Sequence, residues 1–476
     1  MKYIRLSQNT FVRFYKNIGY ITNQFTKQDR VYDEFGRIFL EQITREPKAI
    51  DIITKNLTNI FSDTSLEEIE TDFIEFINEL ESDFFIITAN NIEELEKKDF
   101  TFSYKNFDLR QNAINLLKED ENNLSLTSEY LHDFFRSNPT IFGTHFEVTA
   151  KCNERCIHCY IPHADKTNNI DFAFAISLLD QLKEMGTLSI TFSGGEPFLH
   201  PQFYEILEYA RKNDFIINVL TNGTIIDESK IERLKKLNIA KIQFSIYSMN
   251  PEVHDQITKV PGSFKKTYAN ALKIIENDIP LQISCPIMKV NRNSYKEVAL
   301  WGKKNGVRVL SDFILMAKYD GDTSNLEQRL DISETEQLIK EIIEVEDEYR
   351  ALFEKETPQS YKEKKEEVPI CGVGIDNVCI SYDGLLYPCA GFQGLVLGNS
   401  TESTLKEIWK TSTEINKLRN LKRTKFEKCI SCDALEYCAM CLVRNFNESK
   451  GDMFEINQHY CDVAFLTKKL TAEEFK

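Results

Sequence analysis

Strand-like and helix-like segments alternate six times between residues 141 and 356, and this alternation restricts the fold more than any other feature. The strand-like runs span residues 146–150, 189–193, 216–221, 241–248, 281–288 and 307–316. The helical patterns that follow them span residues 172–185, 202–212, 228–237, 264–276, 294–304 and 334–354. Serial β–α units imply a parallel sheet with right-handed crossovers. Six units are two short of a closed barrel, so we expect an α/β fold with an open, partial (β/α)6 TIM-like barrel and ligands at the carboxyl ends of its strands.

The cysteines indicate iron–sulfur chemistry, because eleven of the twelve fall into three sets that each fit a cluster. The first set, Cys152, Cys156 and Cys159, is a CxxxCxxC run directly after the first strand of the barrel. Three thiolates leave one iron of a [4Fe–4S] cube open, and a small molecule can bind and be reduced there. The other eight are enough for two cubes with four protein ligands each: Cys371, Cys379, Cys389, Cys429, Cys432, Cys438, Cys441 and Cys461.

A disulfide framework is the main alternative for so many cysteines. The N-terminal segment has no apolar signal core. A chain of 476 residues is long enough to bury its cores without covalent staples. In such a chain, paired cysteine spacings indicate metal sites or redox chemistry. No apolar run approaches the roughly 20 residues that span a bilayer. We therefore expect a cytoplasmic protein with no membrane partner.

The length suggests two to four domains. We expect an N-terminal domain over residues 1–90, a bridging linker over 91–140, the barrel over 141–356 and a cysteine-rich domain over 357–476.

The first 90 residues have their own pattern. It contains strand patterns at 10–16, 19–23 and 84–87, a helix at 47–61, and a second helix opened by the capping box Ser65-Leu-Glu-Glu68. This pattern indicates a small winged-helix-like domain. It carries 15 Asp/Glu against 10 Lys/Arg in a chain of net charge −16, so no nucleic acid is expected as a partner.

A second motif, Ser193-Gly-Gly-Glu-Pro197, follows one β–α unit after the first cysteine set. Together the two motifs resemble the radical S-adenosylmethionine (SAM) superfamily, over roughly residues 141–320. The resemblance implies that SAM chelates the open iron and that one electron cleaves it to a 5′-deoxyadenosyl radical, which abstracts hydrogen. It also implies that Gly194 and Gly195 admit the ligand close to the backbone, and that Glu196 accepts a hydrogen bond from the methionyl ammonium. An ordinary turn is the alternative for this motif taken alone.

By the same resemblance, further SAM contacts are expected from residues near the motifs and the strand ends. They are His158, Tyr160, Asn222, Ser245 and Lys259. Lys259 is expected because Thr258 stands where the family often has an arginine for the SAM carboxylate. For each of these residues a purely structural role is the alternative.

The C-terminal cysteines resemble a SPASM domain, which carries two auxiliary [4Fe–4S] clusters, and Asp383-Gly384 predicts a hairpin turn within it. The resemblance assigns the first auxiliary cluster to Cys371, Cys379, Cys389 and Cys441. It assigns the second to Cys429, Cys432, Cys438 and Cys461. Two alternatives stay open. Cys379 need not be a ligand, which would leave another open iron. Zinc is the other, although zinc ribbons separate their CxxC pairs by about 15–20 residues, and only five separate them here.

The resemblances together imply a function. The N-terminal domain resembles a PqqD-like RiPP recognition element, which binds the leader of a ribosomally made precursor peptide by strand addition; a structural cap is the alternative. We therefore expect an oxidoreductase that matures a peptide by joining a Cys sulfur to carbon, with three [4Fe–4S] clusters, SAM, and an electron donor such as flavodoxin or ferredoxin. The alternatives are C–C or C–O crosslinking, epimerisation, formylglycine formation, and a non-catalytic peptide-binding metal scaffold.

Cys285 is the one cysteine outside the three sets, in the middle of a strand pattern. We interpret it as a small buried hydrophobe, with a catalytic thiol as the alternative.

Overall fold

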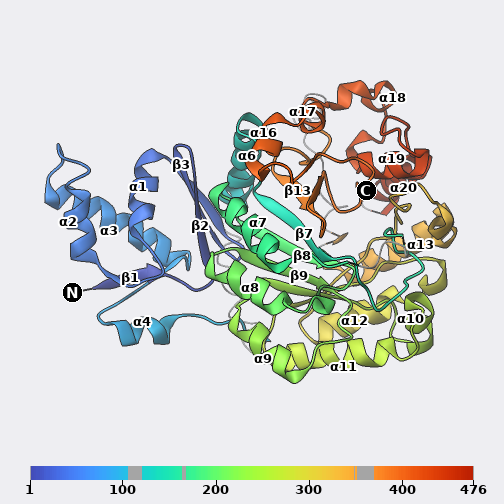
Figure 1. The fold of residues 1–476 in the computed structure, drawn as a ribbon, viewed down its shortest axis with the longest axis horizontal. Coiled ribbons are helices and arrows are strands. Elements are labelled where there is room, and N and C mark those ends of the chain that lie inside the picture. The colour runs from blue at the N-terminus through green and yellow to red at the C-terminus, as the bar shows by residue number, and fades with distance from the viewer. Residues whose placement is uncertain (1, 105–120, 163–167, 348, 351–368, 475–476) are drawn as a thin grey trace.

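The structure is a computed structural model that describes residues 2–104, 121–162, 168–347, 349–350 and 369–474. It has three parts, which follow one another along the chain (Figure 1). A small N-terminal module lies at one end, the barrel lies in the middle, and the cysteine-rich C-terminal part packs against one side of the barrel. No helix in these described ranges is long and apolar enough to cross a membrane.

The six predicted barrel strands are present as parallel neighbours in one sheet, in the order β12-β11-β10-β9-β8-β7. They are β7 (Gly143–Thr149), β8 (Ser189–Gly194), β9 (Ile216–Thr221), β10 (Lys241–Ser245), β11 (Leu281–Ser284) and β12 (Arg308–Leu310). The predicted strands are longer than β10, β11 and β12 because the chain leaves the sheet at the carboxyl ends, where the candidate site lies. The predicted α/β parallel sheet is thus confirmed.

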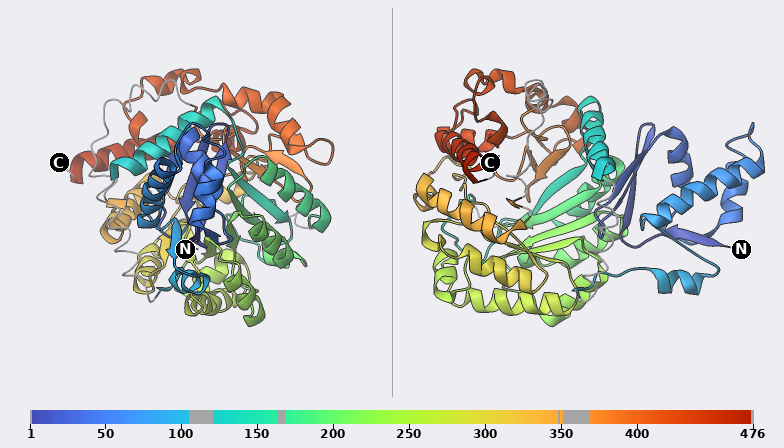
Figure 2. Two further views of the ribbon diagram at one scale, coloured as in Figure 1. Left: turned by 90° about the vertical axis from the view of Figure 1, so that its left-hand side faces the viewer. Right: turned by 180° about the vertical axis from the view of Figure 1, so that it is seen from behind.

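The six predicted helices of the barrel are also present, and Figure 2 shows them on the outside of the sheet. They are α7 (Phe172–Glu184), α8 (Phe203–Lys212), α9 (Glu228–Lys236), α11 (Ser263–Glu276), α12 (Tyr295–Lys304) and α13 (Ile332–Val345). A further helix, α10 (Pro251–Thr258), follows β10. The predicted last helix runs on to residue 354, whereas α13 ends at Val345. Residues 348 and 351–354 lie outside the described residues.

The core of the barrel is large and apolar, because alternate strand residues point toward the outer helices. Phe146, Phe192 and Phe244 are fully buried and come from three different strands. Burying each such side chain contributes roughly 1.5–3 kcal/mol. The opposite face of the same strands carries the polar residues of the candidate site.

The C-terminal part extends the barrel sheet, which the sequence pattern did not predict. β13 (Asn377–Ile380) pairs in parallel with β7, and β14 (Leu385–Tyr387) and β15 (Gly398–Asn399) follow antiparallel. The predicted hairpin at Asp383-Gly384 joins β13 to β14, and Gly384 supplies its positive φ of 84°. The edge of β7 is thereby covered by a strand that starts 234 residues later.

The rest of the C-terminal part is helical. It contains α16 (Leu405–Thr411), α17 (Thr413–Arg419), η6 (Arg423–Lys425), α18 (Glu427–Ile430), η7 (Leu435–Tyr437), α19 (Leu442–Ser449) and α20 (Gln458–Glu474). Leu466 and Leu470 of α20 pack on Ile339 and Ile343 of α13 and tie this part to the barrel. Of the charged stretch at residues 361–369, which begins the predicted cysteine-rich domain, only Pro369 lies within the described residues.

The N-terminal module contains two small antiparallel sheets, with strand orders β5-β1-β6 and β2-β3-β4. Its strands are β1 (Tyr3–Leu6), β2 (Thr10–Tyr15), β3 (Ile18–Asn23), β4 (Asp29–Tyr32), β5 (Lys48–Ala49) and β6 (Ile86–Ala89), and its helices α1 (Glu34–Gln42), α2 (Ile50–Leu57) and α3 (Leu66–Ser82). α4 (Ile92–Lys98) follows β6. The capping box predicted at Ser65 and Glu68 opens α3. The sequence pattern missed β1, β4, β5 and α1. The helix predicted at 47–61 is α2, which begins after β5 and ends at Leu57.

The module packs on the barrel through a shared apolar cluster. Phe11, Tyr15 and Tyr20 of β2 and β3 pack with Phe135 of α6 (Glu121–Ser137) and with Leu188. Residues 91–140, predicted as a bridging linker, thus include α4 and α6, with residues 105–120 outside the described ranges.

Candidate active site

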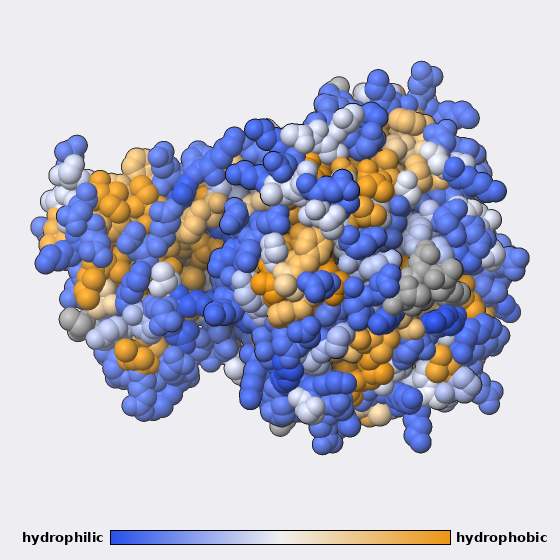
Figure 3. All heavy atoms as spheres, in the orientation of Figure 1, coloured by the Kyte–Doolittle hydropathy of each residue, from blue (hydrophilic) through white to orange (hydrophobic). Residues whose placement is uncertain are grey.

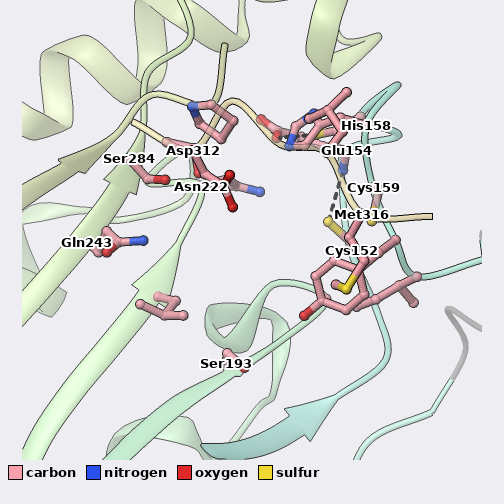
Figure 4. A pocket seen from close by; sticks show the side chains of 18 of the residues that line it. Cys152, Glu154, His158, Cys159, Ser193, Asn222, Gln243, Ser284, Asp312 and Met316 are labelled. Carbon is pink, nitrogen blue, oxygen red and sulfur yellow. Dashed lines mark hydrogen bonds between the residues drawn. The ribbon is translucent and has the colours of Figure 1, made fainter. Parts of the chain in front are cut away.

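A cavity of about 380 Å³ lies at the carboxyl ends of the barrel strands. Figure 4 shows the cysteine loop on one side of it and residues from the strand ends on the other. Its lining includes His145, Cys152, Glu154, Cys156, His158, Cys159, Tyr160, Ser193, Gly194, Gly195, Asn222, Gln243, Ser245, Tyr247, Ser284, Asp312, Met316 and Arg444. The carboxyl ends of parallel barrel strands are where ligands bind in this class of fold.

The structure brings Cys152, Cys156 and Cys159 together in the loop after β7, where all three are half-buried and line the cavity. The Cys156 thiol donates to Glu154 at 3.5 Å and accepts from the Tyr247 hydroxyl at 3.9 Å. Burial, and after it the Glu154 carboxylate, raise the pKa of Cys156 well above its usual range. Three thiols held so close in a low-dielectric site ionise readily only beside a strong positive charge, and the irons of a cluster supply one. The residues present therefore fit a cluster.

Gly194 and Gly195 line the cavity, and they also let the backbone pass very close to the cysteine loop. A Cβ added to Gly194 would lie 2.1 Å from the Thr149 carbonyl oxygen, and one added to Gly195 would lie 2.2 Å from that of Lys151. The Gly195 amide donates to Thr149 O at 2.8 Å, and Gly194 has a φ of 130°. These two glycines therefore set the height of the cysteine loop above the strand ends.

Glu196, predicted to bind the SAM ammonium, is fully buried and does not line the cavity. Its carboxylate accepts from the Thr221 hydroxyl at 2.8 and 2.9 Å and from the Asn222 amide at 2.8 Å. It also accepts from the Phe198 amide at 3.1 Å, which caps the short helix after the motif. Burial raises the pKa of Glu196 to about 7 against the lowering effect of these bonds. In this structure Glu196 joins the ends of β8 and β9.

Four of the other five residues predicted to contact SAM line the cavity: His158, Tyr160, Asn222 and Ser245. His158 packs edge-on against Tyr247, with ring centroids 5.1 Å apart. Lys259 is different, because it ends α10 in a left-handed conformation, is exposed, and does not line the cavity. The position of Lys259 gives no support to its predicted role.

Sequence reasoning predicted Ser245 but missed two other lining residues, Gln243 and Ser284, which strand alternation could have found. Gln243 and Ser245 are two apart on β10, and Ser245 pairs with Ser284 of β11, so all three point to one face. Arg444 could not have been found this way, because it comes from α19 in the C-terminal part. It is the only Lys or Arg among the described residues that line the cavity.

The eight C-terminal cysteines lie in two groups. Cys371, Cys389 and Cys441 are electrostatic neighbours, and Cys379 neighbours Cys389. Burial, and then the nearby Cys441, raise the pKa of Cys371 to about 11 and that of Cys389 to about 12. This group is the one predicted for the first auxiliary cluster. Tyr160 of the cavity lining is an electrostatic neighbour of Cys159 in the first set and also of Cys379 and Cys389 in this group.

The second group contains Cys429, Cys432, Cys438 and Cys461, which are electrostatic neighbours of one another. Arg423 lies beside Cys429, is 7% exposed, and has two buried guanidinium nitrogens with no hydrogen-bond partner among the described residues. A buried, uncompensated cation is costly, and an anionic iron–sulfur cluster on four thiolates would offset it. The residues present therefore fit a cluster here too.

Among the described residues, no three His, Cys, Asp or Glu side chains converge on a point that would hold a single metal ion. In a cube each thiolate binds a different iron, so the thiols stand further apart than around one ion.

Cys285 lies in the barrel core, fully buried and away from the cavity lining. Its thiol donates weakly to the Tyr247 carbonyl at 3.8 Å, and burial raises its pKa far above the usual range. Both observations fit the interpretation of a small buried hydrophobe.

Comparison with protein families agrees with this geometry. Residues 146–302 match the radical SAM superfamily, and residues 371–433 match the iron–sulfur cluster-binding SPASM domain. The protein is therefore an enzyme with a radical SAM domain followed by a SPASM domain, and its cofactors are SAM and iron–sulfur clusters.

Three known proteins illustrate the similarity. An AdoMet-dependent heme synthase of Methanosarcina barkeri is 26% identical, over 66% of this chain and 95% of that protein. The subtilosin biosynthesis protein AlbA of Bacillus subtilis, which serves the production of an antilisterial bacteriocin, is 29% identical, over 64% of this chain and 68% of AlbA. The crystal structure of Streptococcus suis SuiB bound to the precursor peptide SuiA is similar in fold, with a TM-score of 0.64 and 19% identity over 96% of this chain and 99% of that one.

Proposed function

We propose that this enzyme matures a ribosomally made precursor peptide by joining a Cys sulfur of the peptide to a carbon of another residue. The observation that carries this proposal is that Tyr160, which lines the cavity, is an electrostatic neighbour both of Cys159 in the first cysteine set and of Cys379 and Cys389 in the next. One cavity therefore lies beside a site for radical generation and close to a second redox site. A thioether closure needs both.

Different residues would hold the cluster and line the space for SAM. Cys152, Cys156 and Cys159 would hold the cluster that binds SAM, and bound SAM supplies the radical that removes hydrogen from carbon. His158 and the polar strand-end residues Asn222 and Ser245 line the space where SAM would lie.

The second redox site serves the closing step of the reaction. Forming a C–S bond removes one hydrogen from carbon and one from the thiol, so one electron must leave as the bond closes. Cys371, Cys379, Cys389 and Cys441 would hold the first auxiliary cluster, which is the proposed acceptor of that electron. Cys429, Cys432, Cys438 and Cys461 would hold a second one, giving three clusters in all.

The N-terminal module supports a peptide as substrate. The likeness to SuiB extends over 96% of this chain, whereas the heme synthase matches only 66% of it. We propose that the module, residues 1–90, acts as a recognition element for the leader, that residues 91–140 link it to the radical SAM barrel at 141–356, and that residues 357–476 form the SPASM domain.

Strand β4 is the proposed leader-binding edge. The Asn23 amide donates to Gln28 O at 2.9 Å, which makes this a hydrogen-bonded pair between β3 and β4. Because such pairs alternate, the Val31 N–H and C=O point away from β3. No described strand pairs with that side of β4. The nearby surface is partly apolar, with Phe35 66% and Ile60 50% exposed, and Figure 3 shows hydrophobic side chains gathered on the module. An added peptide strand would gain main-chain bonds and side-chain contacts there.

Mass spectrometry of the precursor before and after reaction tests the proposal. Each thioether lowers the peptide mass by two hydrogens and removes one alkylatable thiol. Loss of two hydrogens with every thiol still alkylatable would indicate a C–C or C–O crosslink. An unchanged mass with deuterium uptake at an α-carbon would indicate epimerisation, and an aldehyde trapped by hydrazine would indicate formylglycine.

A further inference from the structure

The segment that leads into the second C-terminal cysteine group is strongly basic in an acidic protein. Residues 413–428 contain six Lys/Arg and two Asp/Glu, while the whole chain has a net charge of −16. The segment forms α17, η6 and α18, which lie along the upper edge of the C-terminal part in Figure 1, away from the N-terminal module. A basic surface of this kind attracts an acidic partner, whereas the rest of the protein repels one.

The charges of this surface are available to a partner. Lys417, Lys425 and Lys428 are exposed. Lys417 forms only a surface ion pair with Glu414 at 2.8 Å, which is worth little because water screens it. Neither Lys425 nor Lys428 has an acidic partner among the described residues. We define these three lysines as the basic patch.

An aromatic contact joins the basic patch to the cysteine group beneath it. A groove lined by Lys417, Lys425 and Phe454 crosses the surface, and Phe454 is 51% exposed. The Phe454 ring stacks on the buried Phe426 ring, with centroids 5.6 Å apart and planes 29° from parallel. The Phe426 carbonyl accepts from the Cys429 amide at 2.8 Å. A continuous series of contacts therefore leads from the surface groove through Phe454 and Phe426 to the cluster ligand Cys429.

We propose that the basic patch and Phe454 are the docking surface for a small acidic one-electron carrier protein, which delivers electrons to the cluster held by Cys429, Cys432, Cys438 and Cys461. The carrier would be oxidised by one electron, and the cluster on these four cysteines would accept it. That electron would then pass through the cluster on Cys371, Cys379, Cys389 and Cys441 to the SAM-binding cluster, with no bond or proton exchanged. The inference rests on the class of enzyme and is independent of the bond made in the peptide. The positive charge of the basic patch indicates an acidic partner. The contact between Phe454 and Phe426 indicates that electrons enter at this surface.

Binding of flavodoxin, as a representative small acidic carrier, tests this proposal directly. The patch variant carries Lys417→Glu, Lys425→Glu and Lys428→Glu. The matched control carries the same change at three exposed lysines of α9 and α11, at positions Lys235, Lys236 and Lys265. The full-length reconstituted proteins are titrated with flavodoxin at low and high salt. We expect the Kd of the patch variant to rise about tenfold or more at low salt, and the difference to shrink at high salt. The control should bind like wild type.

A second variant and a second assay make the outcome decisive. Phe454→Ala leaves the charge unchanged, so its loss of flavodoxin affinity should persist at high salt. SAM cleavage driven by flavodoxin should fall in the patch variant, whereas cleavage driven by dithionite should not. Equal flavodoxin affinity of the patch variant, the control and wild type would overturn the proposal. So would a loss of precursor-peptide affinity with unchanged flavodoxin affinity, which would make the patch a peptide site. Neither readout depends on which product the peptide gives.

Discussion

Arg444 of α19 donates a hydrogen bond of 2.7 Å to Asp312, which follows β12 at the rim of the cavity. The Arg444 guanidinium also lies over the Tyr460 ring, 5.2 Å from its centroid, and donates to the Tyr460 hydroxyl. The Asp312 carboxylate accepts from the Ile314 amide at 3.0 Å as well. The C-terminal part therefore reaches into the candidate active site through one cation, which the barrel holds in place.

Replacing Arg444 with Met removes this cation from the cavity. We expect the KM for the precursor peptide or for SAM to rise about tenfold, because one charge-assisted contact is worth roughly 1.5 kcal/mol. Stability should fall by less than about 1 kcal/mol, since Asp312 is 61% exposed and water screens the pair. Arg444→Lys, which keeps the charge, should recover part of the KM. Unchanged steady-state kinetics in Arg444→Met would show that the pair only fastens the two parts together.

The first cysteine set should be needed for radical generation and not for the C-terminal clusters. Replacing Cys152, Cys156 and Cys159 with Ala should abolish reductive SAM cleavage and lower the iron content by about four atoms per chain. Cys285→Ala is the matched control, because that thiol is buried in the core and should leave both quantities unchanged. Iron and sulfide analysis with deoxyadenosine detection checks both. Deoxyadenosine formed by the triple variant would contradict the site assignment.

His254 should make stability fall in mild acid. Burial lowers its pKa to about 4 although Asp255 opposes the shift, and its Nδ1 accepts from the Tyr247 amide at 3.3 Å. In the unfolded chain His254 has an ordinary histidine pKa near 6.5, so between pH 6.5 and pH 4 it binds a proton there but stays neutral in the folded protein. This contribution to stability is therefore present above pH 6.5 and is lost as the pH falls toward 4.

Urea unfolding midpoints at pH 7 and pH 5 measure this effect. In His254→Gln the fall in stability between the two should be smaller than in wild type. Glu196→Gln provides the opposite control. The pKa of Glu196 is raised to about 7, so the protonated carboxyl stabilises the folded protein at low pH, and this contribution is lost as the pH rises from 4.5 to 7. Without Glu196, the free energy of unfolding should therefore fall more steeply between pH 7 and pH 5. Equal slopes in His254→Gln and wild type would refute the assignment.

The edge of β4 should bind the precursor leader through its backbone. Val31→Pro removes the outward N–H and keeps the bonds between β3 and β4, so leader affinity should fall about fivefold or more. Val31→Ile keeps the N–H and should bind normally. Fluorescence anisotropy with a labelled leader peptide measures both. Deleting residues 1–90 is a weaker test than a point variant, because it would strip Phe11, Tyr15 and Tyr20 from the cluster shared with the barrel. If Val31→Pro bound the leader with unchanged affinity, the proposed leader-binding edge would be wrong and the module would have only a structural role.

Most strands and helices of the barrel could be predicted from local sequence patterns. The strand patterns at 189–193 and 216–221 match β8 and β9 within one residue, because alternate burial in a strand leaves a period of two in the sequence. The Ser65 capping box and the Asp383-Gly384 turn were equally readable, since both depend on residues within four positions. In the N-terminal module β1 and β4 were missed because their burial does not alternate: three of the four β1 residues are buried, and all four β4 residues are half-buried.

The sequence by itself determined the six β–α units, the cysteine sets and the motif at residues 193–197, because each depends on spacing along the chain. Only the tertiary structure decided that β13 would extend the sheet beside β7, that Glu196 would join two strand ends, and that Arg444 would reach the cavity where Lys259 does not. These outcomes depend on which surfaces far apart in sequence become buried against each other. Such burial is settled by the packing of the whole chain, and no local period records it.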